Sequence, residues 1–283
     1  MRLVDYASTL AVMIIWGLQF PFAKIGVTEL PPLFFMATRF VLVASVICPF
    51  FPLPRDKLRG VLVLSLVLGS LHFTSMFVGL SRMDASTASL LVQSQVPFAA
   101  VLAAIFFRDH LGWRRFIGLL AAFAGVVLIL GEPRFGSDPL PPLLILAASF
   151  FWAFANILIK RLGSIDGLAL SGWLALFSAP QLMLLSLLIE DGQGQAMRAA
   201  DWLAWGAVAY GGIAVTVVSY AMWYPLVRRY PVNQTMPFTL LIPLFAVASS
   251  AAILGDELNL QTAVGGAATI LGVAVIVLRP RRA

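Results

Sequence analysis

The sequence predicts an all-α, polytopic membrane protein with ten transmembrane helices in two inverted five-helix repeats around a central cavity. The composition, the spacing of apolar segments and a similarity between the two halves of the chain support this prediction. Hydrophobic residues occupy 60% of the 283 positions and charged residues only 11%, whereas soluble domains are about half apolar and a quarter charged. A soluble fold needs more charge on its surface, so the composition indicates a lipid bilayer as the solvent.

Ten apolar stretches follow one another along the chain, separated by short breaks that contain Pro, Gly or charged residues. A helix needs about 20 apolar residues to cross a bilayer. All acidic residues lie in the breaks or at their edges, as a hydrocarbon solvent demands. No segment between spans is longer than a loop, which excludes a soluble enzyme module. The predicted spans are residues 6–26, 32–53, 60–81, 86–107, 113–131, 140–160, 167–189, 202–226, 234–254 and 261–278.

The basic residues of the breaks predict the orientation. With a cytoplasmic N-terminus, 14 of the 19 Lys and Arg residues fall in cytoplasmic segments, four in external ones, and Arg39 lies within a span. Cytoplasmic loops of membrane proteins carry such an excess of positive charge, so both termini are expected in the cytoplasm. The same placement accounts for the net charge of +6 without a nucleic-acid partner.

The two halves of the chain resemble each other. Trp16 and Lys24 lie eight residues apart in the first span, as Trp152 and Lys160 do in the sixth. Further matches at constant spacing pair Met76, Leu80, Arg82 and Pro97 with Met222, Leu226, Arg228 and Pro243. Each half holds five spans, and an odd number turns the second copy upside down. We therefore expect a first repeat over residues 1–131 and an inverted repeat over residues 132–283.

Polar side chains recur on one face of the fourth and ninth spans. Ser89, Gln93 and Pro97 are spaced four residues apart, and Thr235 and Thr239 repeat the spacing at the aligned positions. Residues four apart share a helical face, and proline frees a backbone carbonyl one turn earlier. We expect the two faces to line the cavity and bind substrate. The alternative is that these groups form hydrogen bonds between helices.

The first and sixth spans each pair an aromatic ring with an amide. Trp16, Gln19 and Phe20 lie together in the first span, and Trp152 and Asn156 lie together in the sixth. Trp16 lies midway along its span, too deep for an interfacial aromatic belt. Such pairs suit an amphipathic substrate, since the ring contacts apolar parts and the amide binds polar ends. Ordinary packing is the alternative.

The third and eighth spans supply the remaining candidates for substrate binding, which are His72, Ser75, Tyr220 and Trp223. His72 lies near the middle of its span and offers a group that binds a carboxylate or relays protons. A buried neutral histidine that is bonded to a neighbouring helix is the alternative. Arg39 lies seven residues into the second span; snorkelling outward or pairing with a loop acid is its expected role, and attraction of a carboxylate is the alternative.

No carboxylate lies deep in a span, which argues against proton antiport through a buried acid and favours a facilitator. Coupling through His72 stays open. Cys48 is the only cysteine, so neither an internal disulfide nor a cysteine metal cluster is expected. An intramembrane enzyme would need a nucleophile with a base or clustered metal ligands, and the spans contain neither. We expect no catalytic site, metal or cofactor.

Several features resemble the EamA-type drug/metabolite transporter superfamily over the whole chain: the segment from Trp16 to Lys24, Arg39, Pro97 and the ending GDELNLQTAVGGAATILGVAVIVL. The resemblance implies ten helices and export of small metabolites across a bacterial inner membrane. It is nearest to amino acid exporters, including the aromatic amino acid group. Asp109 stands where this superfamily more often has Glu, and Glu257 is present only in the second copy.

The sequence thus predicts a multi-pass inner-membrane transporter that exports small metabolites, foremost amino acids such as aromatic or neutral ones, by alternating access, as a facilitator. Its expected partners are a small-molecule substrate and the lipid bilayer, and it is expected to be a monomer, with a dimer as the alternative. The competing functions are a proton-coupled drug efflux carrier that uses His72 and a structural membrane subunit. A nucleotide-sugar carrier would need several basic groups for phosphate, and only Arg39 is available.

Overall fold

The computed structural model describes residues 2–107, 112–130, 138–163, 165–230 and 235–277, and its regular elements in these ranges are all helical. The first half contains α1 (Leu3–Glu29), α2 (Pro32–Ile47), α3 (Leu58–Leu64), α4 (Phe73–Ser81), α5 (Ala85–Leu91), α6 (Gln95–Phe107) and α7 (Trp113–Leu130). The second half contains α8 (Leu140–Leu162), α9 (Gly167–Ile189), α10 (Gln193–Ala199), α11 (Trp202–Ala209), α12 (Ser219–Arg229), α14 (Leu241–Leu254) and α15 (Leu260–Val277).

Eight helical stretches within the described ranges are long and apolar enough to cross a membrane. They are Leu3–Glu29, Pro32–Phe50, Arg55–Ser81, Ala85–Phe106, Leu140–Leu162, Gly167–Ile189, Trp202–Leu226 and Leu260–Val277. Two shorter apolar helices, Phe116–Leu130 and Phe238–Leu254, coincide with the predicted fifth and ninth spans. The all-helical, polytopic character is therefore confirmed, and the count of ten crossings stays a prediction.

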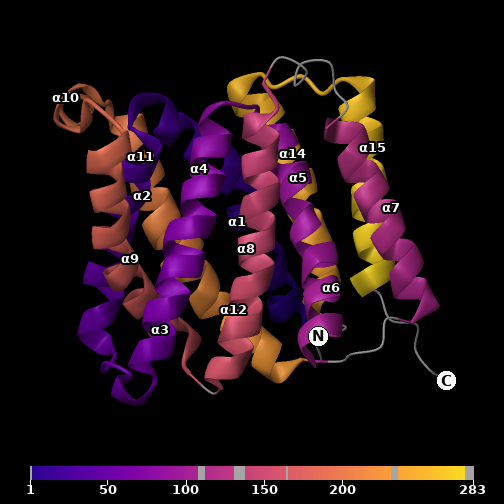
Figure 1. The fold of residues 1–283 in the computed structure, drawn as a ribbon, viewed down its shortest axis with the longest axis horizontal. Coiled ribbons are helices and arrows are strands. Elements are labelled where there is room, and N and C mark those ends of the chain that lie inside the picture. The colour runs from indigo at the N-terminus through magenta and orange to yellow at the C-terminus, as the bar shows by residue number, and fades with distance from the viewer. Residues whose placement is uncertain (1, 108–111, 131–137, 164, 231–234, 278–283) are drawn as a thin grey trace.

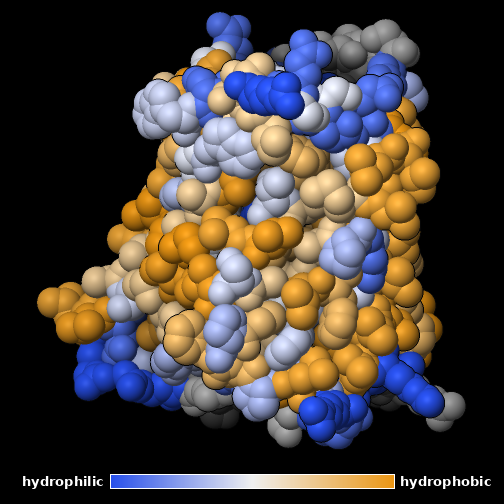
Figure 2. Space-filling model, turned by 90° about the vertical axis from the view of Figure 1, so that its left-hand side faces the viewer, coloured by the Kyte–Doolittle hydropathy of each residue, from blue (hydrophilic) through white to orange (hydrophobic). Residues whose placement is uncertain are grey.

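The outer surface carries the polarity expected of a membrane protein. Figure 2 shows a broad band of mainly hydrophobic residues between two hydrophilic ends. Large apolar side chains stand exposed in this band, as at Val41 and Leu184, which are 56% and 59% exposed. Soluble monomers rarely expose so continuous an apolar surface, so the band is the surface that faces lipid.

The helices form one bundle in which several pairs join the two halves (Figure 1). α2 packs on α9, α7 packs on α15, and α1 packs on α14. The start of α3 and the ends of α8 and α12 lie at the end of the bundle where α1 begins. At the α7–α15 crossing, a Cβ on Gly118 would lie 2.7 Å from the Gly272 carbonyl oxygen. The small residues of these two helices thus serve packing within the chain.

Two π-helical segments interrupt the bundle at matching places. Ser65–His72 joins α3 to α4, and Tyr210–Val218 joins α11 to α12. In the alignment that pairs Met76 with Met222, the two segments match in position along the sequence to within one residue. π-helical turns are rare and often lie at functional sites. Their recurrence at aligned positions is a second similarity between the halves, independent of residue identity.

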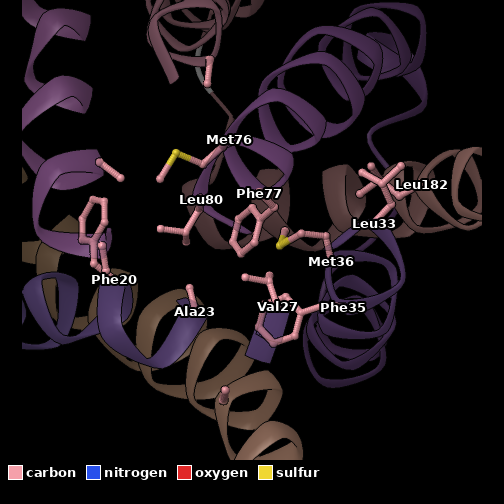
Figure 3. Close-up of a cluster of buried hydrophobic side chains, with 14 of the residues drawn as sticks. Phe20, Ala23, Val27, Leu33, Phe35, Met36, Met76, Phe77, Leu80 and Leu182 are labelled. Atoms are coloured by element: carbon pink, nitrogen blue, oxygen red, sulfur yellow. The ribbon is translucent and has the colours of Figure 1, made fainter. Parts of the chain in front are cut away.

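The hydrophobic core gathers around α1, α2 and α4. Figure 3 shows Phe20 and Val27 of α1 together with Phe35 of α2 and Phe77 and Leu80 of α4. These side chains are at most 7% exposed. Burial of apolar area in a bilayer protein is a matter of close packing between helices rather than of exclusion from water. This cluster packs α1 against α2 and α4 of the first half.

Charged side chains at the bundle ends satisfy helix termini. The amino group of Lys24 donates to the carbonyl oxygens of Leu80, Ser81 and Met83 at 2.9, 3.0 and 2.9 Å. A cation at a helix C-terminus satisfies carbonyls that have no partner within the helix. The Trp16–Lys24 spacing noted in the sequence therefore includes a lysine that caps α4.

Candidate functional site

The structure brings three predicted site residues together between α1 and α12. The ring of Trp16 meets Tyr220 and Trp223 edge to face, with centroids 5.8 and 5.4 Å apart. The Trp16 indole Nε1 donates to the Ser219 hydroxyl at 2.7 Å. Aromatic rings in this arrangement attract each other through their quadrupoles. The three rings and the serine that is bonded to one of them lie together between α1 and α12, and we call these four residues the aromatic cluster.

His72 and Trp152 meet on the other side of the bundle, between the first π-helical segment and α8. The His72 Nδ1 lies 2.8 Å from the carbonyl oxygen of Ala148, and the ring centroid lies 5.1 Å from that of Trp152. A carbonyl oxygen only accepts, so Nδ1 carries a proton. The Asn156 amide donates to the Trp152 carbonyl at 2.9 Å within its own helix. This environment is that of a packed histidine bonded to a neighbouring helix.

The polar residues of the fourth and ninth spans are interior but belong to a packed region. α5 and α14 contact each other directly. Ser89 is fully buried and donates to the Ser86 carbonyl at 2.6 Å, and Gln93 and Thr235 are 6% and 0% exposed. Thr239 is half-buried. In this conformation these polar side chains are therefore packed in the interior of the protein.

Two further predicted residues lie in the interior at a distance from a recognisable site. Phe20 is part of the main hydrophobic core, and Ser75 of α4 is 9% exposed. Gln19, by contrast, takes part in a contact that the sequence did not indicate. Its amide oxygen points to the guanidinium of Arg39.

The placement of Arg39 corrects the expectation that it snorkels outward or pairs with a loop acid. Its side chain is 4% exposed. Its Nη2 lies 3.5 Å from Gln19 Oε1 and 3.4 Å from Thr216 Oγ1. Both partners lie near the middle of their spans, so the guanidinium points inward along the bundle. A Cβ at Gly211 would lie 2.9 Å from Arg39 Nε, so the glycine makes room for this inward course.

The guanidinium of Arg39 keeps unused capacity. Its Nε is buried and has no hydrogen-bond partner among the described residues. No carboxylate in the described ranges forms an ion pair with it. The Thr216 hydroxyl donates to the Gly211 carbonyl at 3.0 Å, so its oxygen is left to accept from Arg39. We call Arg39, Gln19, Thr216 and Gly211 the Arg39 cluster.

The matching contact in the other half is fully satisfied. Ser70 donates to Gln181 Oε1 at 2.6 Å, and Gln181 Nε2 donates to Ser65 Oγ at 2.9 Å. Gln181 of α9 thus contacts the first π-helical segment as Arg39 of α2 contacts the second. We did not predict Gln181. A polar residue midway along an apolar span was the available signal.

Two cavities lined by described residues lie away from both clusters. A groove of about 820 Å³ between α2 and α9 is lined by apolar residues such as Val41 and Leu176. A second cavity of about 590 Å³ lies among Arg55, Arg59 and Arg161 at the end of the bundle where α1 begins. Neither of these two cavities is lined by a predicted site residue.

Comparison with known proteins covers both halves of the chain. The model of the EamA-like transporter family matches residues 6–131 and again residues 140–278. A "Probable amino-acid metabolite efflux pump" of Salmonella typhimurium is 30% identical over 96% of this chain and 94% of its own length. The Escherichia coli protein of the same description is 30% identical over 99% and 97%. A solved crystal structure at 18% identity shares the fold, with a TM-score of 0.63 over 97% and 96% of the two chains.

Proposed function

The chain belongs to the EamA-like transporter family, and from that premise we propose that it exports amino acids or closely related metabolites, with aromatic and neutral side chains preferred. Two relatives that match nearly its full length are described as amino-acid metabolite efflux pumps. The members of this family are transporters and not enzymes. The substrate class and the mechanism are the parts that we propose here.

The juxtaposition of the Arg39 cluster and the aromatic cluster is the observation that carries the substrate class. Trp16 and Gln19 lie three residues apart on α1, and Thr216 and Tyr220 lie four apart where the second π-helical segment meets α12. Residues at these spacings share a helical face. One stretch of the interior therefore offers polar groups beside aromatic surfaces, which is what a zwitterion with an apolar side chain requires.

Alternating access between two inverted five-helix repeats is the transport mechanism that we propose. The aligned π-helical segments and the α2–α9 and α7–α15 pairings support it. At the end where α1 begins, Asp5 accepts from the Tyr230 hydroxyl at 2.6 Å and from Arg229 at 3.2 Å. These bonds join the two halves. Opening of that end requires them to break.

Facilitated export without proton coupling fits the distribution of acids. Asp5 is the only buried carboxylate among the described residues, and it lies in the first turn of α1, next to solvent. A proton-coupled carrier of the common kind has an acid deep in the membrane. We further propose that the protein acts as a monomer in a bacterial inner membrane, with both termini in the cytoplasm.

Counterflow in proteoliposomes tests this function. Vesicles that contain the purified protein are loaded with one unlabelled amino acid, and uptake of the same labelled amino acid is followed with and without a protonophore. We expect stimulated exchange of aromatic and neutral amino acids that the protonophore leaves unchanged. If no amino acid exchanges faster than in protein-free vesicles, the proposed substrate class is wrong. If the protonophore abolishes the exchange, the facilitator mechanism is wrong.

A further inference from the structure

We infer that the guanidinium of Arg39 binds the carboxylate of the transported molecule, an inference that rests on the proposed function and adds a recognition site to it. The observation behind it is a buried cation whose hydrogen-bonding capacity the protein does not fill. Three features of the Arg39 cluster bear on this assignment: the free donor, the missing counter-charge and the surroundings.

The free donor lies on the edge of the guanidinium that recognises carboxylates. Arginine presents its N–H groups as a planar fork, and two parallel bonds from this fork match the two oxygens of a carboxylate. Among the residues that the structure describes, none bonds to Nε, and the two contacts of Nη2 are long, at 3.4 and 3.5 Å. The fork is thus held in place by weak contacts and keeps its strong bonds for another acceptor.

The missing counter-charge points to an anion. Buried charges in proteins are paired or bound to ligands, because an isolated one is costly. Arg39 is only 4% exposed. Its described neighbours Gln19 and Thr216 supply only neutral oxygens. Lys24, also on α1, is occupied by the carbonyl oxygens at the end of α4. One cation by itself suits a monovalent carboxylate better than a phosphate, which several basic groups usually bind.

The surroundings fix where the rest of the ligand lies. Gln19 and Thr216, which contact Arg39, lie three and four residues from Trp16 and Tyr220. The rings of Trp16 and Tyr220 meet each other. A carboxylate on Arg39 therefore places the side chain of an amino acid toward the aromatic cluster. The Arg39 side chain fills the space that a Cβ at Gly211 would occupy.

A binding experiment separates the carboxylate from the remainder of the ligand. The purified full-length protein is heated with tryptophan, with indole-3-propionate, which lacks the amine, or with tryptamine, which lacks the carboxylate. Leucine, 4-methylpentanoate and isoamylamine form a second set. Ligand binding to the folded state raises the unfolding temperature, and the stabilisation grows as RT ln(1 + [L]/Kd). We expect the acids to bind at least tenfold more tightly than the amines to the unchanged protein.

Arg39→Gln should abolish this preference, and Arg59→Gln, which removes an exposed charge from the end of the bundle, should retain it. Arg39→Lys keeps the charge without the fork and should bind the acids with intermediate affinity. If Arg39→Gln does not fold, Arg39→Lys and the unchanged protein still decide the matter.

Equal binding of acids and amines to the unchanged protein, an undiminished preference in the Arg39 variants, or binding of none of the six compounds would overturn the inference. The counterflow assay keeps the two proposals apart. Exchange of amino acids without any preference for the carboxylate leaves the function standing and removes the site. A preference for the carboxylate without exchange leaves the site standing and removes the function.

Discussion

The contacts of Arg39 and Gln181 lie at corresponding places in the two halves and differ in charge and in hydrogen bonding. Each residue lies on a helix of the α2–α9 pair, which is visible at one side of the bundle in Figure 1, and each contacts a π-helical segment. Gln181 is neutral, and its amide makes bonds of 2.6 and 2.9 Å. Arg39 is charged, makes contacts of 3.4 and 3.5 Å, and leaves Nε unbonded.

This difference shows how a duplicated architecture divides its roles. A neutral amide with short hydrogen bonds stabilises the contact between two helices and needs nothing more. A buried guanidinium without an acid costs free energy, and the cost is compensated only when an anion enters. The two contacts therefore predict opposite consequences for the same kind of substitution: loss of transport in one half and loss of stability in the other.

Arg39→Met should separate transport from stability most sharply. A hydrogen bond to a charged group is worth about 1.5–3 kcal/mol, so we expect the rate of exchange at low substrate to fall about 10- to 100-fold. The unfolding temperature should stay the same or rise, because methionine replaces an unpaired buried charge with an apolar side chain of similar volume. Counterflow rates and thermal unfolding measure the two effects. A large fall in unfolding temperature would instead make Arg39 a structural residue.

Gln181→Leu should show the reverse pattern. The substitution removes the acceptor of the Ser70 hydroxyl and the donor to Ser65 Oγ, and a buried polar group that loses its bond costs about 1–3 kcal/mol. We expect a lower unfolding temperature and an unchanged exchange rate per folded molecule. Thermal unfolding of the detergent-purified variant, followed by counterflow at equal amounts of folded protein, makes the comparison. Retained stability with lost exchange would place the binding site in the second half.

The sequence predicted the helices well because the bilayer sets their length. The predicted span 167–189 coincides with α9, and each of the other nine coincides with a described helix or helical stretch to within a few residues. The contacts of Trp16 with Trp223 and of His72 with Trp152 were not predictable. Helical periodicity gives the face of a residue but not the neighbour that this face meets.

Arg39 shows most clearly what periodicity leaves out. Its depth in the second span followed from the sequence, and outward snorkelling followed from the usual behaviour of long basic side chains. The direction of the side chain instead depends on Gly211 and Thr216, which lie in the other half of the chain. The space beside a glycine and an oxygen left to accept are tertiary features, so this residue could be located but not oriented.

Gly211→Ala tests the Arg39 cluster without a change of charge. The new Cβ would lie 2.9 Å from Arg39 Nε and 3.0 Å from Cδ and Cζ, which displaces the guanidinium from Gln19. We expect about a tenfold weaker binding of acids, equivalent to about 1.4 kcal/mol. Gly69→Ala in the first π-helical segment is the matched control, since its Cβ would meet Ser178. Overpacking there should cost about 1–3 kcal/mol of stability with little effect on acid binding.

The pair Thr216→Val and Ser70→Ala should give the smallest effects and the finest test. Thr216 offers Arg39 one oxygen at 3.4 Å, a long contact whose loss should weaken acid binding by only about two- to fivefold, below 1 kcal/mol. Ser70 donates to Gln181 at 2.6 Å, and its loss should lower stability by about 1 kcal/mol and leave binding unchanged. Thermal unfolding at increasing ligand concentrations measures the affinity for acids. Thermal unfolding of the same samples without ligand measures the stability. If both variants changed acid binding equally, the two halves would share the ligand, and the division of roles between Arg39 and Gln181 would be wrong.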